Sequence, residues 1–405
     1  MLERGSKYER TAQDFTIEEK KGRFKMRISL ASTEAPICRA LTLPTVAAYS
    51  PSVLRYLFVG VAALLALPLF AAEPPSTPPT LPPTSTIYVA QENSALNQFE
   101  ENPAVTRRMV DRVVRAATGQ NDTVKAWRSL VSPNDRVGIK VAAAGGRYFA
   151  SHHGIVEAIL DGLEQAGIPR NRVIIWDREA DDLRSAGYVS ERGGYQTASI
   201  PPTRGYDRQA QFSAPILGKL IWGDLLFDEK QGKLGKRSEP ADQLSSSSYL
   251  SNVLSKQVTK VINVPVLCDE AGCGVAGAIY NMTVPNLDNW RRFTQTDSDA
   301  ASGLLDIYAD ERVGGKVVLT IMDALIAQYA SGPRFNPNYA FPYHTIYASK
   351  DALALDANAF RLIEGWRKQS KLPSIADRAE WLQMGEQMGL GHFAENKIIL
   401  RSVDP

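Results

Sequence analysis

The feature that most restricts the fold is an alternation of β-branched runs with amphipathic segments, which starts near residue 86. Apolar runs at 86–91, 135–141 and 172–177 have the length and the β-branched content of strands. Between them, residues 102–119 and 151–168 place apolar side chains three and four positions apart, as on one face of a helix. This order favours a mostly parallel sheet covered by helices, and we therefore predict an α/β fold.

The second half of the chain repeats this pattern after an irregular segment. Residues from about 187 to 250 are rich in Gly, Ser, Pro and Gln, so we predict an insertion there. Further strands are predicted at 258–267, 316–325, 344–349 and 396–403, with helices from near Asp351 and over 374–391. A single α/β domain is therefore expected over residues 87–405.

Residues 1–72 are predicted to be an export leader. The apolar stretch YLFVGVAALLALPLFAA (56–72) follows several basic residues and ends in small side chains. These properties fit a cleavable signal peptide, and an uncleaved membrane anchor is the alternative. Residues 73–86 are rich in proline and are predicted to be a linker. We expect an exported protein of the periplasm or cell envelope, which contacts a membrane only through the leader if the leader is uncleaved.

The charge distribution makes nucleic acid an unexpected partner. The chain has 46 Lys and Arg residues against 44 Asp and Glu residues. The basic residues are scattered along the sequence and are not massed beside aromatic residues, as they are in proteins that bind a phosphate backbone.

Polar side chains stand at the ends of the predicted strands, where open α/β sheets bind ligands. These candidates are Lys140, Asp177, Asn263, Asp269, Glu270 and Asp323. Each also has a structural interpretation, because an Asp after a strand often caps a helix and a Lys can extend from a sheet edge to solvent.

The segment KVAAAGGRYFASHHG (140–154) predicts an anion site. A strand that passes through a small-residue loop into a helix presents backbone N–H groups and the positive end of a helix dipole. Gly145 and Gly146 allow close approach, Arg147 adds charge, and Ser151 is the expected helix cap. His152 lies in the first turn, where the dipole should lower its pKa and leave it available as a base or ligand. The alternative is an ordinary solvated helix start.

Cys268 and Cys273 are the cysteines that remain if the leader, which holds Cys38, is removed. A disulfide or buried free thiols, metal ligation and a catalytic thiol all stay open. Two thiolates alone satisfy neither an iron–sulfur cluster nor a structural zinc site. Asp269 and Glu270 would raise the pKa of a neighbouring thiol, which disfavours a nucleophile.

Arg334 in the GPRFNP turn is a further candidate, because an arginine in an exposed loop suits a carboxylate or phosphate. A plain surface turn is the alternative. The sequence has no G-x-S-x-G motif, so a serine nucleophile elbow is not indicated.

The order of DRVGIKV, GIVEAILDGLEQAGI, RVIIWDR, INVPVL, AGAIYNMT, VVLTIMDALIAQYASGP and IYASKDALALDANAFRLI resembles the bacterial and archaeal domain of unknown function number 362, over about residues 86–403. The resemblance implies that Lys140, Asp177, Asn281, the Gly332-Pro333 turn and Asp356 occupy recurrent positions of that family. Some relatives carry ferredoxin-like cysteine motifs, and many carry export leaders.

The sequence departs from the family pattern in three places. The ferredoxin cysteine set is missing, which puts electron transfer in doubt here. Asp269 and Glu270 stand where relatives often place a histidine, and Tyr280 replaces a lysine.

Three hypotheses follow. In the leading one, a cleft binds a small anionic ligand and can act on it, with Lys140 and Arg334 holding the anion while His152 or Asp177 moves a proton. The ligand would also contact Gly145, Gly146, Asn281 and Asp356. The second is a metal or redox protein that uses Cys268 and Cys273, and the third is a non-catalytic binding module of the cell envelope. The cofactor is unknown.

Overall fold

The computed structural model describes residues 14–20, 23–29, 81–213, 247–294 and 299–403. The chain divides into two units, Met1–Pro75 and Ser76–Pro405. In the first unit, β1 (Asp14–Lys20) and β2 (Arg23–Ser29) form an antiparallel pair. Most of the predicted leader, residues 73–80 of the linker and residues 214–246 of the insertion lie outside the described residues. The described part of the chain has no helix that is long and apolar enough to cross a membrane, and the apolar stretch 56–72 is not in that part.

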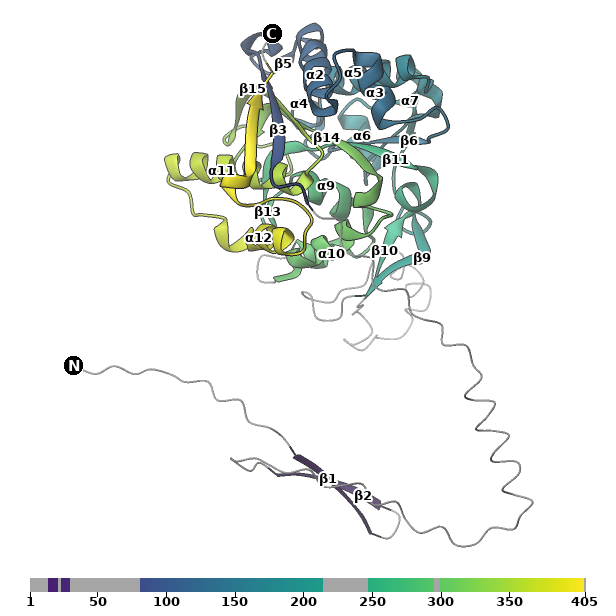
Figure 1. Cartoon of the computed structure of the whole chain (residues 1–405), viewed down its shortest axis with the longest axis vertical. Helices are drawn as coiled ribbons and strands as arrows, with labels where there is room; N and C mark the ends of the chain where they lie inside the picture. Colours follow the sequence, from purple (N-terminus) through teal and green to yellow (C-terminus); the bar gives the residue numbers. More distant parts are fainter. Residues whose placement is uncertain (1–13, 21–22, 30–80, 214–246, 295–298, 404–405) are drawn as a thin grey trace, which may run out of the picture. The chain divides into compact units, whose positions relative to one another are not determined.

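The second unit is built on a ten-stranded sheet (Figure 1). Its strands are, in spatial order, β16 (Ile398–Ser402), β3 (Ser85–Gln91), β15 (Ala340–Ser349), β14 (Val317–Gln328), β11 (Lys260–Val264), β6 (Val137–Val141), β7 (Ile174–Trp176) and β8 (Gln196–Ala198). All neighbouring pairs on this path are parallel except the two that involve β15. The remaining strands are β12 (Val266–Glu270), which runs parallel to β14, and β13 (Gly274–Val275), which pairs with β12. The α/β class with a mostly parallel sheet is therefore confirmed.

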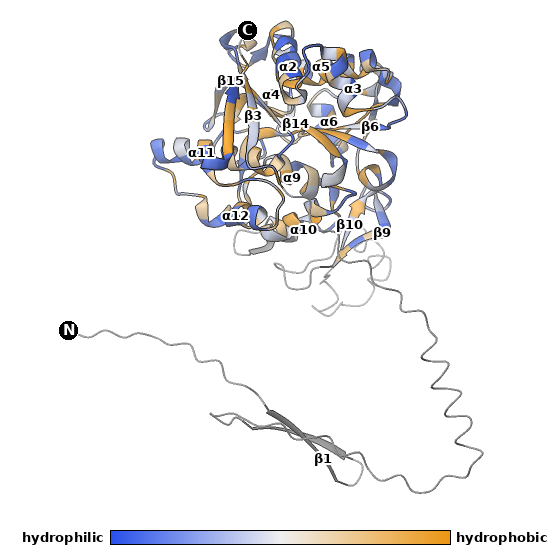
Figure 2. Cartoon of the chain, in the orientation of Figure 1, coloured by the Kyte–Doolittle hydropathy of each residue, from blue (hydrophilic) through white to orange (hydrophobic). Residues whose placement is uncertain are grey.

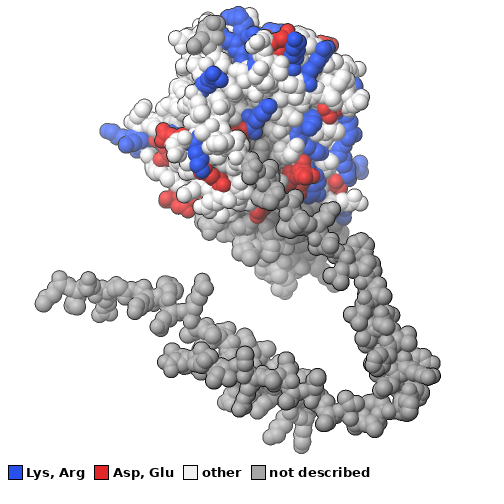
Figure 3. Space-filling view, in the orientation of Figure 1, with Lys and Arg blue, Asp and Glu red and all other residues white. Residues whose placement is uncertain are grey.

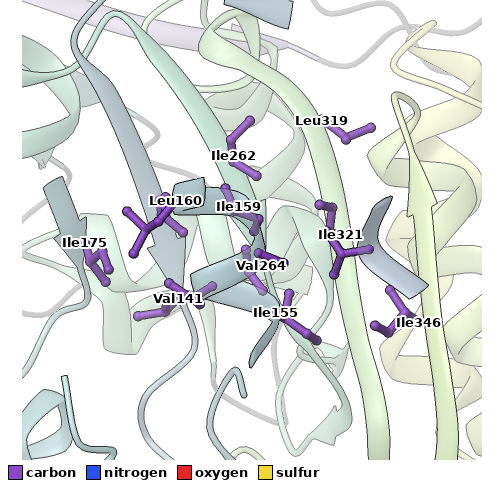
Figure 4. Close-up of a cluster of buried hydrophobic side chains, with 14 of the residues drawn as sticks. Val141, Ile155, Ile159, Leu160, Ile175, Ile262, Val264, Leu319, Ile321 and Ile346 are labelled. Carbon is purple, nitrogen blue, oxygen red and sulfur yellow. The ribbon is translucent and has the colours of Figure 1, made fainter. Parts of the chain in front are cut away.

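Helices cover both faces of the sheet, and each face has its own apolar core. One face carries α2 (Pro103–Thr118), α3 (Thr123–Leu130) and α5 (His153–Ala166), and the other carries α9 (Ala278–Thr283), α10 (Gly303–Ala309), α11 (Ala352–Gln369) and α12 (Glu380–Gln387). Figure 4 shows how Ile155 and Ile159 of α5 meet Val141, Val264 and Ile321 of the strands. In Figure 2, β14 and much of β15 are orange, as expected for strands buried on both faces, and the helices combine blue and orange faces.

The structure corrects two boundaries. The run predicted as one strand at 258–267 is split at Pro265 into β11 and β12, because proline has no N–H to donate to a ladder. Helix α5 begins at His153 with His152 as its N-cap, and Ser151 does not cap it. The Ser151 hydroxyl accepts from the Ala142 N–H (2.8 Å) and donates to the Val264 carbonyl (2.6 Å), which joins β6 to β11.

The described part of the insertion contains the short helix α7 (Ser190–Gly193), β8, and the antiparallel pair β9 (Tyr206–Ser213) and β10 (Ser247–Ser251). Another short helix, α6 (Ala180–Ser185), lies just before it. Tyr206 and Leu250 are buried in the second core. These strands therefore belong to the packed unit.

Candidate functional site

A cleft of about 440 Å³ lies where the chain leaves the carboxyl-terminal ends of β6, β7 and β12. Residues 142–145 follow β6, residues 177–179 follow β7, and Cys268 and Glu270 belong to the end of β12. Tyr280 and Asn281 of α9 and the loop 331–334 also line it. The position agrees with the general rule that ligands of open α/β sheets bind at the carboxyl ends of strands.

Lys140 lies behind this cleft and is fully buried. Its ammonium donates to Asp177 Oδ1 (2.7 Å), to the Val141 carbonyl (2.7 Å) and to Asn281 Oδ1 (3.1 Å). Three acceptors satisfy all three N–H groups. Burial lowers the pKa of Lys140, and Asp177 opposes that shift. The Lys140 ammonium therefore has no free N–H group in this structure with which to bind an anion, the role predicted for it from the sequence.

Asp177 and Asn281 connect Lys140 to the surface of the cleft, which they line. Asp177 Oδ2 accepts from the Ala143 N–H (2.7 Å), so it fixes the loop after β6. The amide of Asn281 donates to Asn263 Oδ1 (2.8 Å). Four predicted residues thus form one buried polar network: Lys140, Asp177 and Asn281, with Asn263 behind them.

The loop after β6 is shaped by its glycines. Gly145 lines the cleft, and a Cβ at this position would overlap the Phe149 carbonyl. Gly146 has φ +63°, a conformation that favours glycine, but it does not line the cleft. Arg147 is also away from the cleft lining, and its exposed guanidinium is 3.4 Å from Glu100.

Asp269 and Glu270 hold the opposite rim. Asp269 Oδ1 accepts from the Gly332 N–H (2.8 Å), which ties the 331–334 loop to β12. Glu270 Oε2 accepts from the Gly272 and Cys273 N–H groups (both 2.7 Å). Burial raises the pKa of both carboxyls. Arg334 stands on this loop with its side chain 74% exposed, 3.6 Å from Asp182.

The cleft is more acidic than the sequence indicated. Its lining includes the carboxylates of Asp177, Glu179, Asp182 and Glu270 and the guanidiniums of Arg178 and Arg334. Three of these carboxylates have a cationic partner, namely Asp177 with Lys140, Glu179 with Arg178 and Asp182 with Arg334. Glu270 forms no ion pair with any Lys, Arg or His of the described residues.

His152 belongs to a separate cluster and does not line the cleft. Its Nδ1 and its backbone N–H each lie 2.7 Å from Asp323 Oδ2, and the Gly154 N–H donates to Glu101 (2.9 Å). The anion predicted at this helix start is thus supplied by two carboxylates of the protein. Burial lowers the pKa of His152, but Asp323 and Glu101 outweigh it, so that pKa is raised and not lowered as predicted.

Asp356 is buried on α11, outside the cleft lining, and it positions α9. Its two oxygens accept from the Ala278 and Ile279 N–H groups. Burial raises its pKa to about 7. Asp356 therefore supports Tyr280 and Asn281 from behind and is not placed to touch a ligand.

Cys268 and Cys273 are buried free thiols that pack in the two different cores, on opposite faces of the sheet. Burial raises the pKa of both far above the usual range. Within the described ranges, no group of three or more His, Cys, Asp or Glu side chains is arranged to hold a metal. Of the alternatives that the sequence leaves open for these two cysteines, the structure shows buried free thiols.

Sequence reasoning missed Arg178, Glu179 and Asp182 in the cleft and Glu101 beside His152. The first two directly follow Asp177 at the end of β7, so the rule about strand ends could have included them. Glu101 is on β5 (Glu100–Glu101), and no local pattern links it to residue 152.

The comparisons with known proteins find two weakly similar solved structures and one family model. No curated protein matches the chain. A protein from Thermotoga maritima has a TM-score of 0.37 and 8% identity, over 68% of this chain and 61% of that chain. The lactate racemase apoprotein from Thermoanaerobacterium thermosaccharolyticum has a TM-score of 0.35 and 7% identity, over 65% and 54%. This chain spans less than two thirds of the length of either.

A family model matches a narrower region than the one over which the motif order was recognised. The matched residues include β11, β12, α9, β14 and β15, and they end within α11. Lys140 and Asp177 lie outside the match, whereas Asn281, Arg334 and Asp356 lie inside it. Residues 237–361 match the family described as "Domain of unknown function (DUF362)", so the resemblance of this chain to that family is confirmed.

Proposed function

We propose that the protein binds a small molecule in the 440 Å³ cleft, and that this ligand carries both a cationic or hydrogen-bond-donating group and an anionic group. Glu270 is the observation that carries the proposal. It is a largely buried carboxylate that lines the cleft and has no cationic partner among the described residues. Buried charges are normally paired, so a donor on the ligand would complete this site.

Arg334 is placed to bind the anionic group of the ligand. Its ion pair with Asp182 is long, at 3.6 Å, and its side chain is 74% exposed. Pairs of this kind contribute at most about 1 kcal/mol, so an anionic group of a ligand can replace Asp182 at little cost. A purely anionic ligand is less favoured than the sequence indicated, because it would also face Glu270.

Of the two proton-transfer candidates, only Asp177 lines the cleft. If the protein transforms the bound molecule, we assign the proton transfer to Asp177. The buried ammonium of Lys140 would balance the negative charge of the Asp177 carboxylate. If the protein does not transform the bound molecule, it is a non-catalytic binding module. Among the residues that the structure describes, no observation favours a metal or redox function. Export through the leader remains part of the proposal and rests on the sequence of residues 1–72.

Four probes with one five-carbon chain separate the charge classes: glutarate, 5-aminopentanoate, 1,5-diaminopentane and 1,5-pentanediol. Saturation-transfer NMR on the full chain, which detects weak binding, should give the strongest signal for 5-aminopentanoate. Ala144→Trp, which fills the cleft, should abolish the signal. Ala309→Trp, at an exposed helix end away from the cleft, is the control. Glutarate as the strongest binder, or equal signals in the two variants, would reject the proposal.

A further inference from the structure

A second, open pocket of about 500 Å³ lies between the carboxyl-terminal end of α2 and the end of β16. It shares no lining residue with the cleft. The side chains of its lining that carry hydrogen-bond donors are those of Tyr88, Arg112, Arg115, Gln120, Asn121, Arg401 and Ser402.

The charges in this pocket are all of one sign. Three guanidiniums line it and no carboxylate does. Arg401, on the last strand, forms no ion pair within the described residues. Arg115 donates to main-chain carbonyls of Asp111 (3.3 Å) and Asn121 (3.5 Å), so its charge is not neutralised by these bonds.

Arg112 is the most buried of the three, with its side chain 11% exposed. It forms an ion pair with Glu92, and its Nε is buried without a hydrogen-bond partner. A buried N–H without an acceptor costs free energy that a suitably placed ligand oxygen would recover.

The last turn of α2 satisfies two of its carbonyls with its own backbone. Those of Arg115 and Ala116 accept from the Gln120 and Gly119 N–H groups, which close the helix in a left-handed turn at Gly119. Figure 3 shows Lys and Arg side chains, with some Asp and Glu side chains among them, on the end of the molecule where α2 and the C-terminus lie in Figure 1. The side-chain charge of the pocket lining is positive, which favours an anion and outweighs the partial negative charge of the helix end.

We propose that this pocket binds a phosphate group carried by a small molecule or by a lipid headgroup. Guanidinium groups match the geometry of phosphate oxygens and keep their charge at every physiological pH. A phosphate group, with one negative charge as a diester and about two as a monoester, would relieve the repulsion among the three arginines and supply the acceptor that Arg112 lacks. This site is independent of the function proposed for the cleft.

The test uses the full chain and two probes, inorganic pyrophosphate by calorimetry at low salt and phosphatidylglycerol vesicles by co-sedimentation. The variant Arg115→Gln/Arg401→Gln removes two charges from the pocket. The variant Lys125→Gln/Arg128→Gln removes two exposed charges from α3 and leaves the pocket intact. We expect at least tenfold weaker binding in the first variant and less than a twofold change in the second.

Each outcome either supports the proposal or overturns it. Pyrophosphate binding that depends on the pocket arginines identifies a free phosphate compound as the ligand class. Vesicle binding with that dependence, without pyrophosphate binding, identifies a lipid headgroup. No binding of either probe, or an equal loss in both variants, overturns the proposal. Thermal unfolding of each variant shows that a loss does not come from misfolding.

Discussion

The ammonium of Lys140 lies 2.7 Å from the Asp177 carboxylate, and neither side chain is more than 8% exposed. This pair joins β6 to the residue that follows β7, and Asp177 in turn fixes the loop that forms one wall of the cleft. The polar network is therefore a structural part of the cleft, and only its outer members can meet a ligand.

Lys140→Met should destabilise the protein strongly, because it leaves Asp177 buried without its cation. Breaking such a pair costs about 3–5 kcal/mol. Lys140→Met/Asp177→Asn removes the uncompensated charge and should recover part of the loss. Urea unfolding of the single and double variants measures this. A cost below about 1 kcal/mol for the single variant would contradict the pairing.

Asp356 should make stability fall as the pH rises. Its pKa is about 7 in the folded protein and about 3.9 in an unfolded chain, so the folded state holds the extra proton between these values. The free energy of unfolding contributed by this proton is lost as the pH rises through that window, by up to roughly 4 kcal/mol. The stability advantage of wild type over Asp356→Asn should shrink from pH 4 to pH 8. A pH-independent difference between the two proteins would exclude this explanation.

His152 should titrate above its usual range because Asp323 and Glu101 outweigh its burial. A raised pKa means that the charged form stabilises the fold at low pH and that this contribution is lost as the pH rises through the folded value. Asp323→Asn should lower the pKa of His152 in an NMR titration, with His152→Gln used to assign the signal. An unchanged pKa in Asp323→Asn would show that the 2.7 Å contact does not control the imidazole.

Two glycine substitutions should act in opposite directions. A Cβ at Gly277 would overlap Asp356 Oδ1, so Gly277→Ala should cost about 1–3 kcal/mol. Gly365 lies in α11 with open space around it, so Gly365→Ala should stabilise by about 0.5–1 kcal/mol. Thermal unfolding of both variants gives the comparison, and a destabilised Gly365→Ala together with a neutral Gly277→Ala would contradict it.

Cys268 and Cys273 should resist alkylation in the native state. Both thiols are buried, and burial raises their pKa, which removes the reactive thiolate. Mass-spectrometric mapping after iodoacetamide treatment should find both unlabelled until the protein is unfolded. Rapid labelling of either one would show an accessible thiol, and absence of labelling after unfolding would show a disulfide.

The alternation of strands and helices was predictable because each element carries its own local pattern. The strands at 86–91 and 135–141 and the helix that begins after Asp351 lie close to where that pattern placed them. The break between β11 and β12 at Pro265 could have been predicted, because proline has no N–H to donate to a ladder. The order of strands in the sheet depends on which distant segments pair, and no local pattern contains that information.

The chemistry of the site was only partly predictable for the same reason. The structure brings Lys140, Asp177 and Asn281 together; strand ends indicated the first two, and the family resemblance indicated all three. Whether a cation is free depends on its partners in space. Lys140 meets Asp177, 37 positions away, and His152 meets Asp323, 171 positions away. The protein therefore neutralises by itself the positive groups from which an anion site was predicted.

The charge preference of the cleft is tested most directly by the affinity of 5-aminopentanoate for the full chain and for Glu270→Gln, with glutarate measured in parallel. We predict that Glu270→Gln weakens 5-aminopentanoate at least fivefold and leaves glutarate unchanged or more tightly bound, because the substitution removes the carboxylate that attracts an amino group. Equal affinity of 5-aminopentanoate for both proteins would contradict the assignment of Glu270 as the ligand-binding carboxylate.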